Sequence, residues 1–314
     1  MRYYIGQTDY DWFTYLSQIS PEDVNFWRPG GKTNFKVLQP GAPFLLKLKS
    51  PYSAIAGVGF FSSHTFLPIT VAWDTFGNRN GCATFEQLRI KILAYRDGHK
   101  EHNPVIGCTV LTNPIFFNIK DWIKTPEDWS KSIVQGKSYD TEDLIGNRIW
   151  RRVEELLSRY LVFNEAEAAK SQLMLEDQGL PGYKQKILSK VRLGQGAFRI
   201  LITDAYSRKC SITGERTLPV LEAAHIKPYS LSGPHFISNG ILLRSDLHKL
   251  FDSGYITITR EYRLEVSNRL KEEFDNGKEY YQFHGMVLKS LPPREADKPQ
   301  CHFIDWHNSE VYKG

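Results

Sequence analysis

The sequence predicts a protein of the α+β class, in which a β-rich segment precedes a helix-rich segment and a mixed one. Residues 1–125 are rich in aromatic, β-branched, glycine and proline residues, which is typical of short strands joined by turns. Residues 126–185 favour helix, and residues 186–314 combine short strands with helices. Because 314 residues are long for one compact core, we expect two folded domains joined by a helical connector.

The first region is expected to form a small β-barrel or sheet with one helix packed against it. Residues 44–48 and 54–61 are its clearest strands, since both are rich in residues that favour strands and are bounded by turn signals. Within residues 83–97, apolar side chains recur at helical spacing. Residues 104–117 then return to a strand composition.

The connector and the last region are expected to contain both helices and short strands. In the connector, we expect helices over residues 121–133 and 141–175. In the last region, we expect a helix over 194–206, a strand over 218–226, a strand and helix over 240–254, a hairpin over 255–267, and an irregular tail over 303–312.

Composition and charge are those of an ordinary globular protein. Hydrophobic residues make up 41% of the chain and charged residues 24%, which argues against intrinsic disorder. No segment approaches the roughly 20 apolar residues of a membrane span, and the N-terminus lacks the apolar core of a signal peptide. We therefore expect a cytoplasmic protein without membrane contact. The net charge of +5 suits a polyanionic partner without requiring one.

The residues that indicate chemistry lie between positions 208 and 256. His225 closes a strand, Asn239 follows the next loop, and His248 lies nine residues later inside a helix. Phosphodiester hydrolysis needs a base that deprotonates water near neutral pH, which suits an imidazole, and a cation that stabilises the leaving oxygen. We therefore predict His225 as the general base and His248 as a metal ligand. Asn239 is expected to complete the catalytic site by pinning the loop through side-chain hydrogen bonds to the backbone.

This segment resembles the HNH, or ββα-metal, nuclease family. The resemblance rests on four motifs: C-x-x-T-G at Cys210–Gly214, EAAHI-x-P at Glu222–Pro228, NG-x-L-L at Asn239–Leu243, and H-x-L-F-D-x-G at His248–Gly254. It implies an HNH nuclease domain over residues 186–314 and a metal-dependent DNA endonuclease. The implied cofactor is a divalent metal ion, Mg²⁺ or Mn²⁺, with Co²⁺ and Ni²⁺ as further candidates.

One position departs from the family pattern. Many HNH nucleases carry an Asp or His metal ligand immediately before the base histidine, and here that position is Ala224. Glu222 lies two residues earlier, on the same face of the strand, so it can replace the missing ligand directly or through water. Asn239 is an alternative ligand. Asp252 is expected to cap or pair locally, and His235 is expected to be incidental.

Other polar and sulfur-containing residues near the motif receive simpler interpretations. Arg244 and Lys249 flank the site and are candidates for phosphate contacts, with solvated surface charges as the alternative. Cys210 has no cysteine partner at zinc-binding spacing, so it is expected to be a buried core residue.

The N-terminal region resembles the PUA-like superfamily, and within it the EVE- and YTH-type readers of modified bases. The resemblance rests on the opening strand MRYYIGQT, on FWRPGGKTNFKVLQPGAPFLLKLK and on AIAGVGFF. Such a reader holds a flipped base between aromatic faces and recognises its edge by hydrogen bonds. The residues expected to bind the base are Trp27, Trp73, Phe35, Asn34 and Asp74. The alternative is that these aromatic side chains simply belong to the core of the domain.

A reader domain followed by an HNH nuclease resembles modification-dependent, type IV-like restriction endonucleases. This implies binding of double-stranded DNA that carries 5-methylcytosine or 5-hydroxymethylcytosine. Because one HNH site cuts one strand, a homodimer is expected, with a contact through the helices of residues 140–175. Two alternatives stay open. The first is an HNH nuclease directed by a DNA sequence, a structured RNA or a partner protein. The second is a catalytically decayed DNA-binding protein, which Ala224 alone favours.

Overall fold

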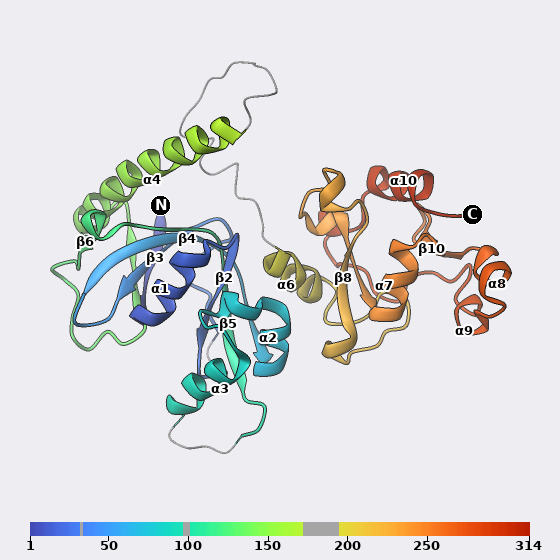
Figure 1. Cartoon of the computed structure of the whole chain (residues 1–314), viewed down its shortest axis with the longest axis horizontal. Helices are drawn as coiled ribbons and strands as arrows, with labels where there is room; N and C mark the ends of the chain where they lie inside the picture. The colour runs from blue at the N-terminus through green and yellow to red at the C-terminus, as the bar shows by residue number, and fades with distance from the viewer. Residues whose placement is uncertain (32–33, 97–100, 172–194) are drawn as a thin grey trace. The chain divides into compact units, whose positions relative to one another are not determined.

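A computed structural model describes residues 1–31, 34–96, 101–171 and 195–314 of the chain (Figure 1). It divides into two compact units, Met1–Gly194 and Gln195–Gly314, which are described separately below. Both units combine helices and strands, so the predicted α+β class is confirmed. No helix among the described residues is long and apolar enough to cross a membrane.

The first unit is built on a seven-stranded mixed sheet. Its strands are β1 (Arg2–Thr8), β2 (Asp23–Arg28), β3 (Pro43–Leu48), β4 (Ala54–Pro68), β5 (Val105–Phe116), β6 (Ile123–Lys124) and β7 (Gly136–Asp140). Six of them follow the order β2-β5-β4-β3-β1-β7, and β6 pairs with β4. The β1–β3 pair is parallel, and the other pairs are antiparallel. The strands predicted over residues 44–48, 54–61 and 104–117 are confirmed.

The sheet is strongly curved, and its two ends approach each other. Register shifts interrupt the pairing of β4 with β3 and with β5, and such bulges bend a sheet. Arg28, the last residue of β2, donates a hydrogen bond of 3.0 Å to the side-chain oxygen of Gln135, next to β7. Where a barrel was expected, the structure has a curled sheet. The Arg28–Gln135 hydrogen bond links its two edges, and the described strands β2 and β7 do not pair with each other.

Two helices cover opposite faces of this sheet. Helix α1 (Tyr10–Ile19) buries its apolar side on the face that carries Phe44 and Leu46. Helix α4 (Leu144–Ser171) covers the face that carries Leu45. Alternate residues of β3 serve the two cores because successive strand side chains point to opposite faces. The residues of α4 packed there have helical spacing: Ile149, Val153, Leu156 and Leu157.

The segment over residues 126–185, expected as a separate connector, contributes a strand and a helix to the first unit. Strand β7 pairs with β1, and α4 packs on the sheet, so both belong to the first unit. The helix predicted over residues 121–133 is wrong, because Ile123 pairs with Ile55 as a strand and Pro126 follows. The helix predicted over 141–175 is confirmed up to Ser171, and its last residues lie outside the described part of the chain.

Two further helices complete the first unit. Helix α2 (Ile69–Phe76) follows β4 directly, and helix α3 (Phe85–Ala94) confirms the helix predicted over residues 83–97. The Thr84 side chain accepts a hydrogen bond from the backbone of Gln87 and so caps α3. A short 3-10 turn, Gly77–Asn80, connects α2 toward α3 and places Asn80 in the interior.

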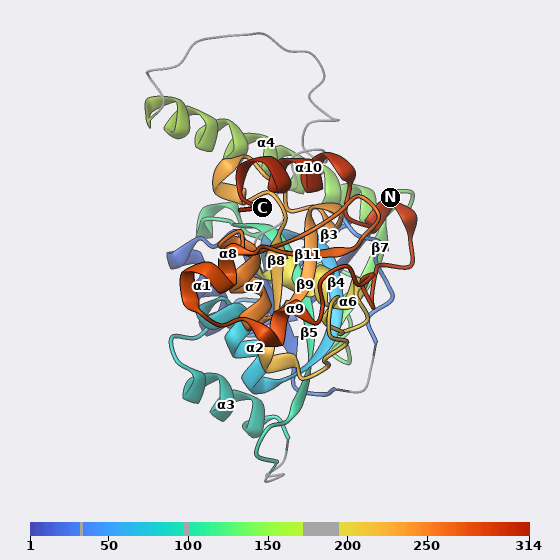
Figure 2. The same cartoon turned by 90° about the vertical axis from the view of Figure 1, so that its right-hand side faces the viewer.

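The second unit wraps short strands and helices around its own core (Figure 2). Helix α6 (Gln195–Ala205) precedes the hairpin of β8 (Leu221–His225) and β9 (Gly240–Arg244), and α7 (Ser245–Asp252) follows β9 without a loop. A second hairpin joins β10 (Ile256–Ile258) to β11 (Leu264–Val266). Helices α8 (Arg269–Phe274), α9 (Lys278–Tyr281) and α10 (Cys301–Glu310) complete the unit.

The prediction of an irregular tail over residues 303–312 is wrong, because most of this segment forms helix α10. Its buried residues, Phe303, Ile304 and His307, lie on one side of the helix. The His307 ring stacks on Phe251 of α7 at 3.8 Å, and its Nε2 lies 3.1 Å from the Phe251 carbonyl oxygen. This tertiary contact fixes a helix whose local sequence pattern is weak.

The stability of the second unit is expected to fall as the pH drops from about 6.5 toward 4. Burial lowers the pKa of His307 to about 4. A histidine whose pKa is lower in the folded state stabilises the fold above its unfolded pKa of about 6.5, and protonation removes this contribution at lower pH. The loss from His307 is roughly 3 kcal/mol. Calorimetric melting between pH 7 and 4.5 should show a steeper decline for the wild type than for His307→Gln; parallel declines would contradict the prediction.

Candidate functional site

The predicted catalytic residues lie on one strand–loop–strand–helix frame in the second unit. Strands β8 and β9 are antiparallel, and His225 stands opposite Gly240. Because α7 starts directly after β9, its first two turns lie beside β8 (Figure 1). The frame therefore brings a strand residue, a loop residue and a helix residue together, as the motif order predicts.

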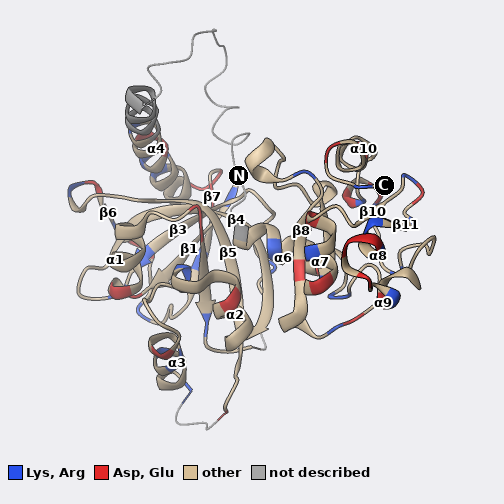
Figure 3. Ribbon diagram, turned by 45° about the vertical axis from the view of Figure 1, so that its right-hand side comes forward, with Lys and Arg blue, Asp and Glu red and all other residues tan. Residues whose placement is uncertain are grey.

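His248 lies between two carboxylates. Its Nδ1 is 2.6 Å from Oε2 of Glu222 on β8, and its Nε2 is 3.2 Å from Oδ2 of Asp252 on α7. His248 and Asp252 are four residues apart and so share one face of the helix. The structure thus places Glu222 beside His248, as the sequence predicts. It also brings in Asp252, to which the sequence assigned only a local role. Figure 3 shows the acidic residues of β8 and α7.

The donor set of this cluster suits a divalent metal ion. In the described part of the chain, no three His, Cys, Asp or Glu side chains are already arranged around a metal position. Both ring nitrogens of His248 contact a carboxylate, so a bound ion would take the place of one of these contacts. Two carboxylates and one imidazole are oxygen and nitrogen donors that Mg²⁺, Mn²⁺, Co²⁺ and Ni²⁺ accept. The residues present therefore fit the ion that the family implies.

His225 is partly buried and held on two sides. Its ring stacks on Phe198 of α6, with 3.8 Å between centroids and 10° between planes. Its Nε2 lies 2.8 Å from Nδ1 of His235 in the loop between β8 and β9. Burial lowers the pKa of His225 to about 4, and the charges of His235 and His248 act in the same direction. The ring is therefore neutral at pH 7, which is the state a general base needs.

Asn239 is fully buried and closes the loop between β8 and β9. Its Oδ1 accepts a hydrogen bond from the Lys227 backbone N–H at 2.9 Å. Its Nδ2 donates to the carbonyl oxygens of Lys227 and Pro234 at 3.0 and 2.8 Å. The amide is thus used at both ends for pinning the loop, as the sequence predicts. The alternative of Asn239 as a metal ligand gains no support, because its oxygen faces the backbone.

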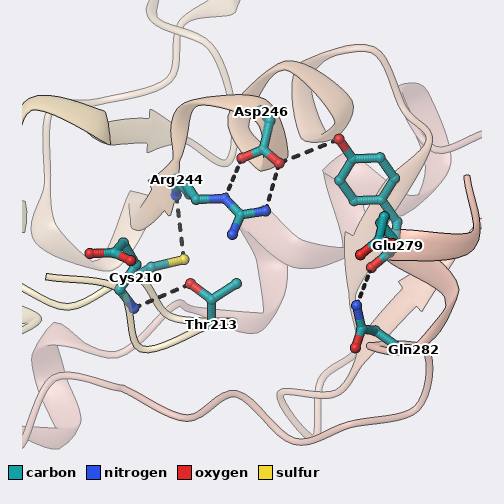
Figure 4. Close-up of polar contacts among 8 residues, drawn as sticks. Cys210, Thr213, Arg244, Asp246, Glu279 and Gln282 are labelled. Atoms are coloured by element: carbon teal, nitrogen blue, oxygen red, sulfur yellow. Dashed lines mark hydrogen bonds and ion pairs between the residues drawn. The ribbon is translucent and has the colours of Figure 1, made fainter. Parts of the chain in front are cut away.

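The two cations expected to contact phosphate differ in their surroundings. The Arg244 guanidinium forms two bonds of 2.6 and 2.7 Å with Asp246, which also accepts a 3.3 Å hydrogen bond from Tyr280 (Figure 4). Arg244 is therefore already neutralised by a carboxylate, contrary to a free phosphate-binding role. Lys249 is exposed on α7 and stays a candidate phosphate contact.

Cys210 is fully buried, in agreement with a core role. Its Sγ accepts a hydrogen bond from the Arg244 backbone N–H at 3.3 Å, and its own N–H bonds to the Glu215 carbonyl. Thr213, which follows it in the motif, accepts a bond from the Glu215 backbone through its hydroxyl (Figure 4). These contacts hold the loop before β8 against the start of α7.

In the first unit, Trp27 lines a cavity of about 230 Å³. Trp27 lies on β2, and its Nε1 donates to the Asn80 carbonyl at 2.9 Å. Its ring meets Tyr95 edge-on, with 6.3 Å between centroids. Aromatic and charged side chains together line this cavity, among them Trp12, Asp9, Arg28 and Lys49.

The charged groups of the cavity are linked to one another. Lys49 Nζ lies 2.6 Å from Asp9 and donates a 3.0 Å hydrogen bond to the Tyr95 hydroxyl. The Tyr95 hydroxyl in turn donates to the other oxygen of Asp9 at 2.9 Å. Arg28 is held between Gln135 and the Tyr4 hydroxyl. The cavity therefore combines aromatic faces with oriented hydrogen-bonding groups.

The other residues expected to bind the base lie elsewhere. Phe35 is 5% exposed and packs in the core against Tyr4 and Phe61, in agreement with the alternative of a core residue. Trp73 lies on α2 next to Phe85 and does not line the cavity. Asn34 and Asp74 are exposed and do not line it either. The four residues therefore do not gather with Trp27 around this cavity, because the sequence could not show which aromatic residues face the core.

Comparisons with known proteins agree with the site in the second unit. A family model described as HNH endonuclease matches residues 210–259. Among solved structures, the chain is similar to ASCH from Zymomonas mobilis, with a TM-score of 0.32 and 11% identity over 50% of this chain and 94% of that chain. It is also similar to the modification-dependent TagI restriction endonuclease, with a TM-score of 0.30 and 13% identity over 92% of this chain and 75% of that chain. No curated protein matches.

The family match covers the segment that holds His225, Asn239 and His248 on one frame. The resemblance read from the four sequence motifs is thereby confirmed. Residues 210–259 of this chain are an HNH endonuclease domain.

Proposed function

We propose that this protein is a modification-dependent restriction endonuclease that binds DNA carrying 5-methylcytosine or 5-hydroxymethylcytosine and hydrolyses its phosphodiester bonds. The observation that carries the proposal is a cavity with aromatic walls in the first unit of a chain whose second unit contains an HNH endonuclease domain. The N-terminal sequence supports it through its resemblance to readers of modified bases.

The cavity suits a single flipped base. Its volume of about 230 Å³ is below the roughly 300–1,000 Å³ of pockets for drug-sized ligands, which favours one flat ring system. Trp27 and Tyr95 offer aromatic faces for stacking, and Asp9, Lys49 and Arg28 offer donors and acceptors for the base edge. We assign base binding to this set in place of Trp73, Phe35, Asn34 and Asp74.

In the nuclease site, His225 acts as the general base. Its neutral ring accepts a proton from water, and the resulting hydroxide attacks phosphorus. Glu222, His248 and Asp252 would hold the divalent ion, which when bound polarises the phosphate and stabilises the leaving oxygen. Asn239 fixes the loop that lies against His225, and exposed Lys249 attracts the DNA backbone.

A homodimer stays part of the proposal, because one HNH site cuts one strand. The described part of α4 offers a limited contact surface. Its buried apolar residues, Ile149, Val153, Leu156 and Leu157, already pack on the sheet of the same chain, whereas Leu144 is exposed. Sedimentation in the presence of substrate DNA measures the oligomeric state directly.

The test of the proposal is digestion of matched plasmids that carry unmodified, 5-methylated or 5-hydroxymethylated cytosine. We expect cleavage of the modified plasmids and survival of the unmodified one. Equal cleavage of all three would reject modification dependence and favour a nuclease directed by another signal. No cleavage with any of Mg²⁺, Mn²⁺, Co²⁺ or Ni²⁺ would favour a decayed nuclease.

Trp27→Ala is expected to weaken binding to modified DNA by roughly 5- to 150-fold, because base stacking contributes about 1–3 kcal/mol per base. Trp73→Ala is the matched control, since Trp73 is also a partly exposed tryptophan of the first unit but lies outside the cavity. Affinities measured with modified and unmodified duplexes check the prediction. Equal losses for the two variants would place the base-binding site elsewhere.

A further inference from the structure

A second histidine in the second unit is in direct contact with the general base. His235 lies in the loop between β8 and β9, is 8% exposed, and stacks on Tyr229 with 4.3 Å between ring centroids. Its Nδ1 lies 2.8 Å from Nε2 of His225. The two ring planes are inclined at 58°, so the contact joins ring edges rather than faces. The distance is that of a hydrogen bond between two imidazoles.

We infer that His235 is a positioning residue for His225, whose Nε2–H donates to His235 Nδ1 and thereby leaves the lone pair on His225 Nδ1 for water. The inference rests on the proposed role of His225 as general base. It assigns a role to a residue that lies outside the HNH motifs and that the sequence pattern marked as incidental.

The direction of the hydrogen bond follows from the chemistry of a neutral imidazole, which carries one N–H donor and one acceptor nitrogen. If His235 donated, the lone pair of His225 Nε2 would be used and the proton of His225 would stand on Nδ1. Neither nitrogen of His225 would then accept a proton from water. If His225 donates, Nδ1 is the free acceptor, and only this arrangement gives a base.

The surrounding contacts hold His235 in place for this role. Asn239 donates to the carbonyl oxygen of Pro234, the residue immediately before His235. Tyr229, in the 3-10 turn that follows β8, stacks on the imidazole with only 15° between planes. Phe198 stacks on His225 and also lies 5.4 Å from the His235 ring. The loop held by Asn239 therefore positions His225 through the His235 side chain as well as through the backbone.

The proton balance of the step is simple. Water gives one proton to His225 Nδ1, and its oxygen forms a bond to phosphorus. One phosphorus–oxygen ester bond breaks, and its electron pair goes to the leaving oxygen, which takes a proton from solvent to become a hydroxyl. His225 becomes positively charged while the Nε2 proton stays between the two rings. A hydrogen bond whose donor is charged is stronger than a neutral one, so a neutral His235 stabilises the protonated form that appears during the reaction, whereas a charged His235 would disfavour it. His225 then releases its extra proton to solvent.

Two variants of the full-length protein test the inference. His235→Phe keeps a flat ring against Tyr229 and removes the acceptor, whereas His235→Asn places an amide oxygen close to the position of Nδ1. We expect kcat to fall by roughly 10- to 100-fold in His235→Phe, by analogy with partners that orient a metal-binding histidine, with KM and the melting temperature unchanged. His235→Asn should recover most of kcat. Equal kcat in both variants, or a loss in KM alone, would overturn the inference.

A second measurement does not depend on turnover. The imidazole ¹⁵N chemical shifts of His225 in the wild type should report a proton on Nε2 and a lone pair on Nδ1. A proton on Nδ1 would overturn the inference even if the variants fold poorly. Both experiments use whichever plasmid the wild type cuts. If the wild type also cuts unmodified DNA, only the modification dependence is rejected, and the role of His235 can still be tested. If the wild type cuts no DNA, the roles of both His225 and His235 are rejected.

Discussion

Replacing His225 by alanine is expected to reduce the rate of DNA cleavage by roughly 10²–10⁴-fold, the contribution typical of a positioned general base. The buried ring is neutral at pH 7, and it is held by Phe198 on one side and His235 on another. Alanine removes the only imidazole in this position and leaves a space that water can fill without being deprotonated. Binding of DNA should change little, since the proposed role of His225 is to act on water rather than on the DNA backbone.

The measurement is the initial rate of cleavage of modified plasmid at saturating enzyme, together with a gel-shift affinity for the same DNA. His302→Ala provides the control, because His302 is an exposed histidine of the same unit, on α10. A His225→Ala protein that cuts within about twofold of His302→Ala would remove His225 from the mechanism. Matched melting temperatures for the two variants exclude unfolding as the cause of a lost rate.

Replacing His248 by alanine is expected to weaken metal binding by at least 10- to 100-fold and to reduce cleavage in proportion at limiting metal. Loss of residues that only orient metal ligands already has effects of this size. Among the residues that the structure describes, His248 contacts both carboxylates of the cluster, Glu222 and Asp252. Without it, two negative charges face each other, and only oxygen donors remain.

The experiment strips the protein with EDTA and titrates Mg²⁺, Mn²⁺, Co²⁺ and Ni²⁺ back into wild type, His248→Ala and Asp252→Asn. Direct binding of Mn²⁺ provides a readout that does not depend on cleavage. If Asp252 completes the ligand set, Asp252→Asn should need more metal for half-maximal activity than the wild type. Identical titration curves for wild type and His248→Ala would show that the ion is held by other residues.

The Asp252 result bears on the meaning of Ala224. A chain that lacks the usual ligand before its base histidine is open to interpretation as a decayed nuclease. The structure offers an alternative ligand from the same strand, Glu222, and one from the facing helix, Asp252. Both lie at His248, so the missing ligand does not leave the histidine without carboxylate partners. Activity restored by any of the four metals would reject the decayed interpretation.

The sequence predicted the elements whose side chains repeat with a clear local period. Strands over residues 44–48 and 54–61 and the helix over 83–97 follow from such patterns, and the order of His225, Asn239 and His248 follows from motif spacing. The errors arose where local pattern is weak. Within residues 121–133, Ile123 and Lys124 pair with the sheet and the predicted helix does not form. The tail forms α10 because His307 stacks on Phe251 and the helix packs on the core.

The sequence by itself thus determined the fold class, the HNH motif and the place of its strand and helix histidines. The tertiary structure alone decided which side chains meet. Phe35 turns into the core while Trp27 lines a cavity, and His235 reaches His225 through a loop closed by Asn239. Local periodicity fixes the face of an element on which a residue lies. The partner across space depends on strand register and loop closure, which are set by contacts between residues distant in sequence.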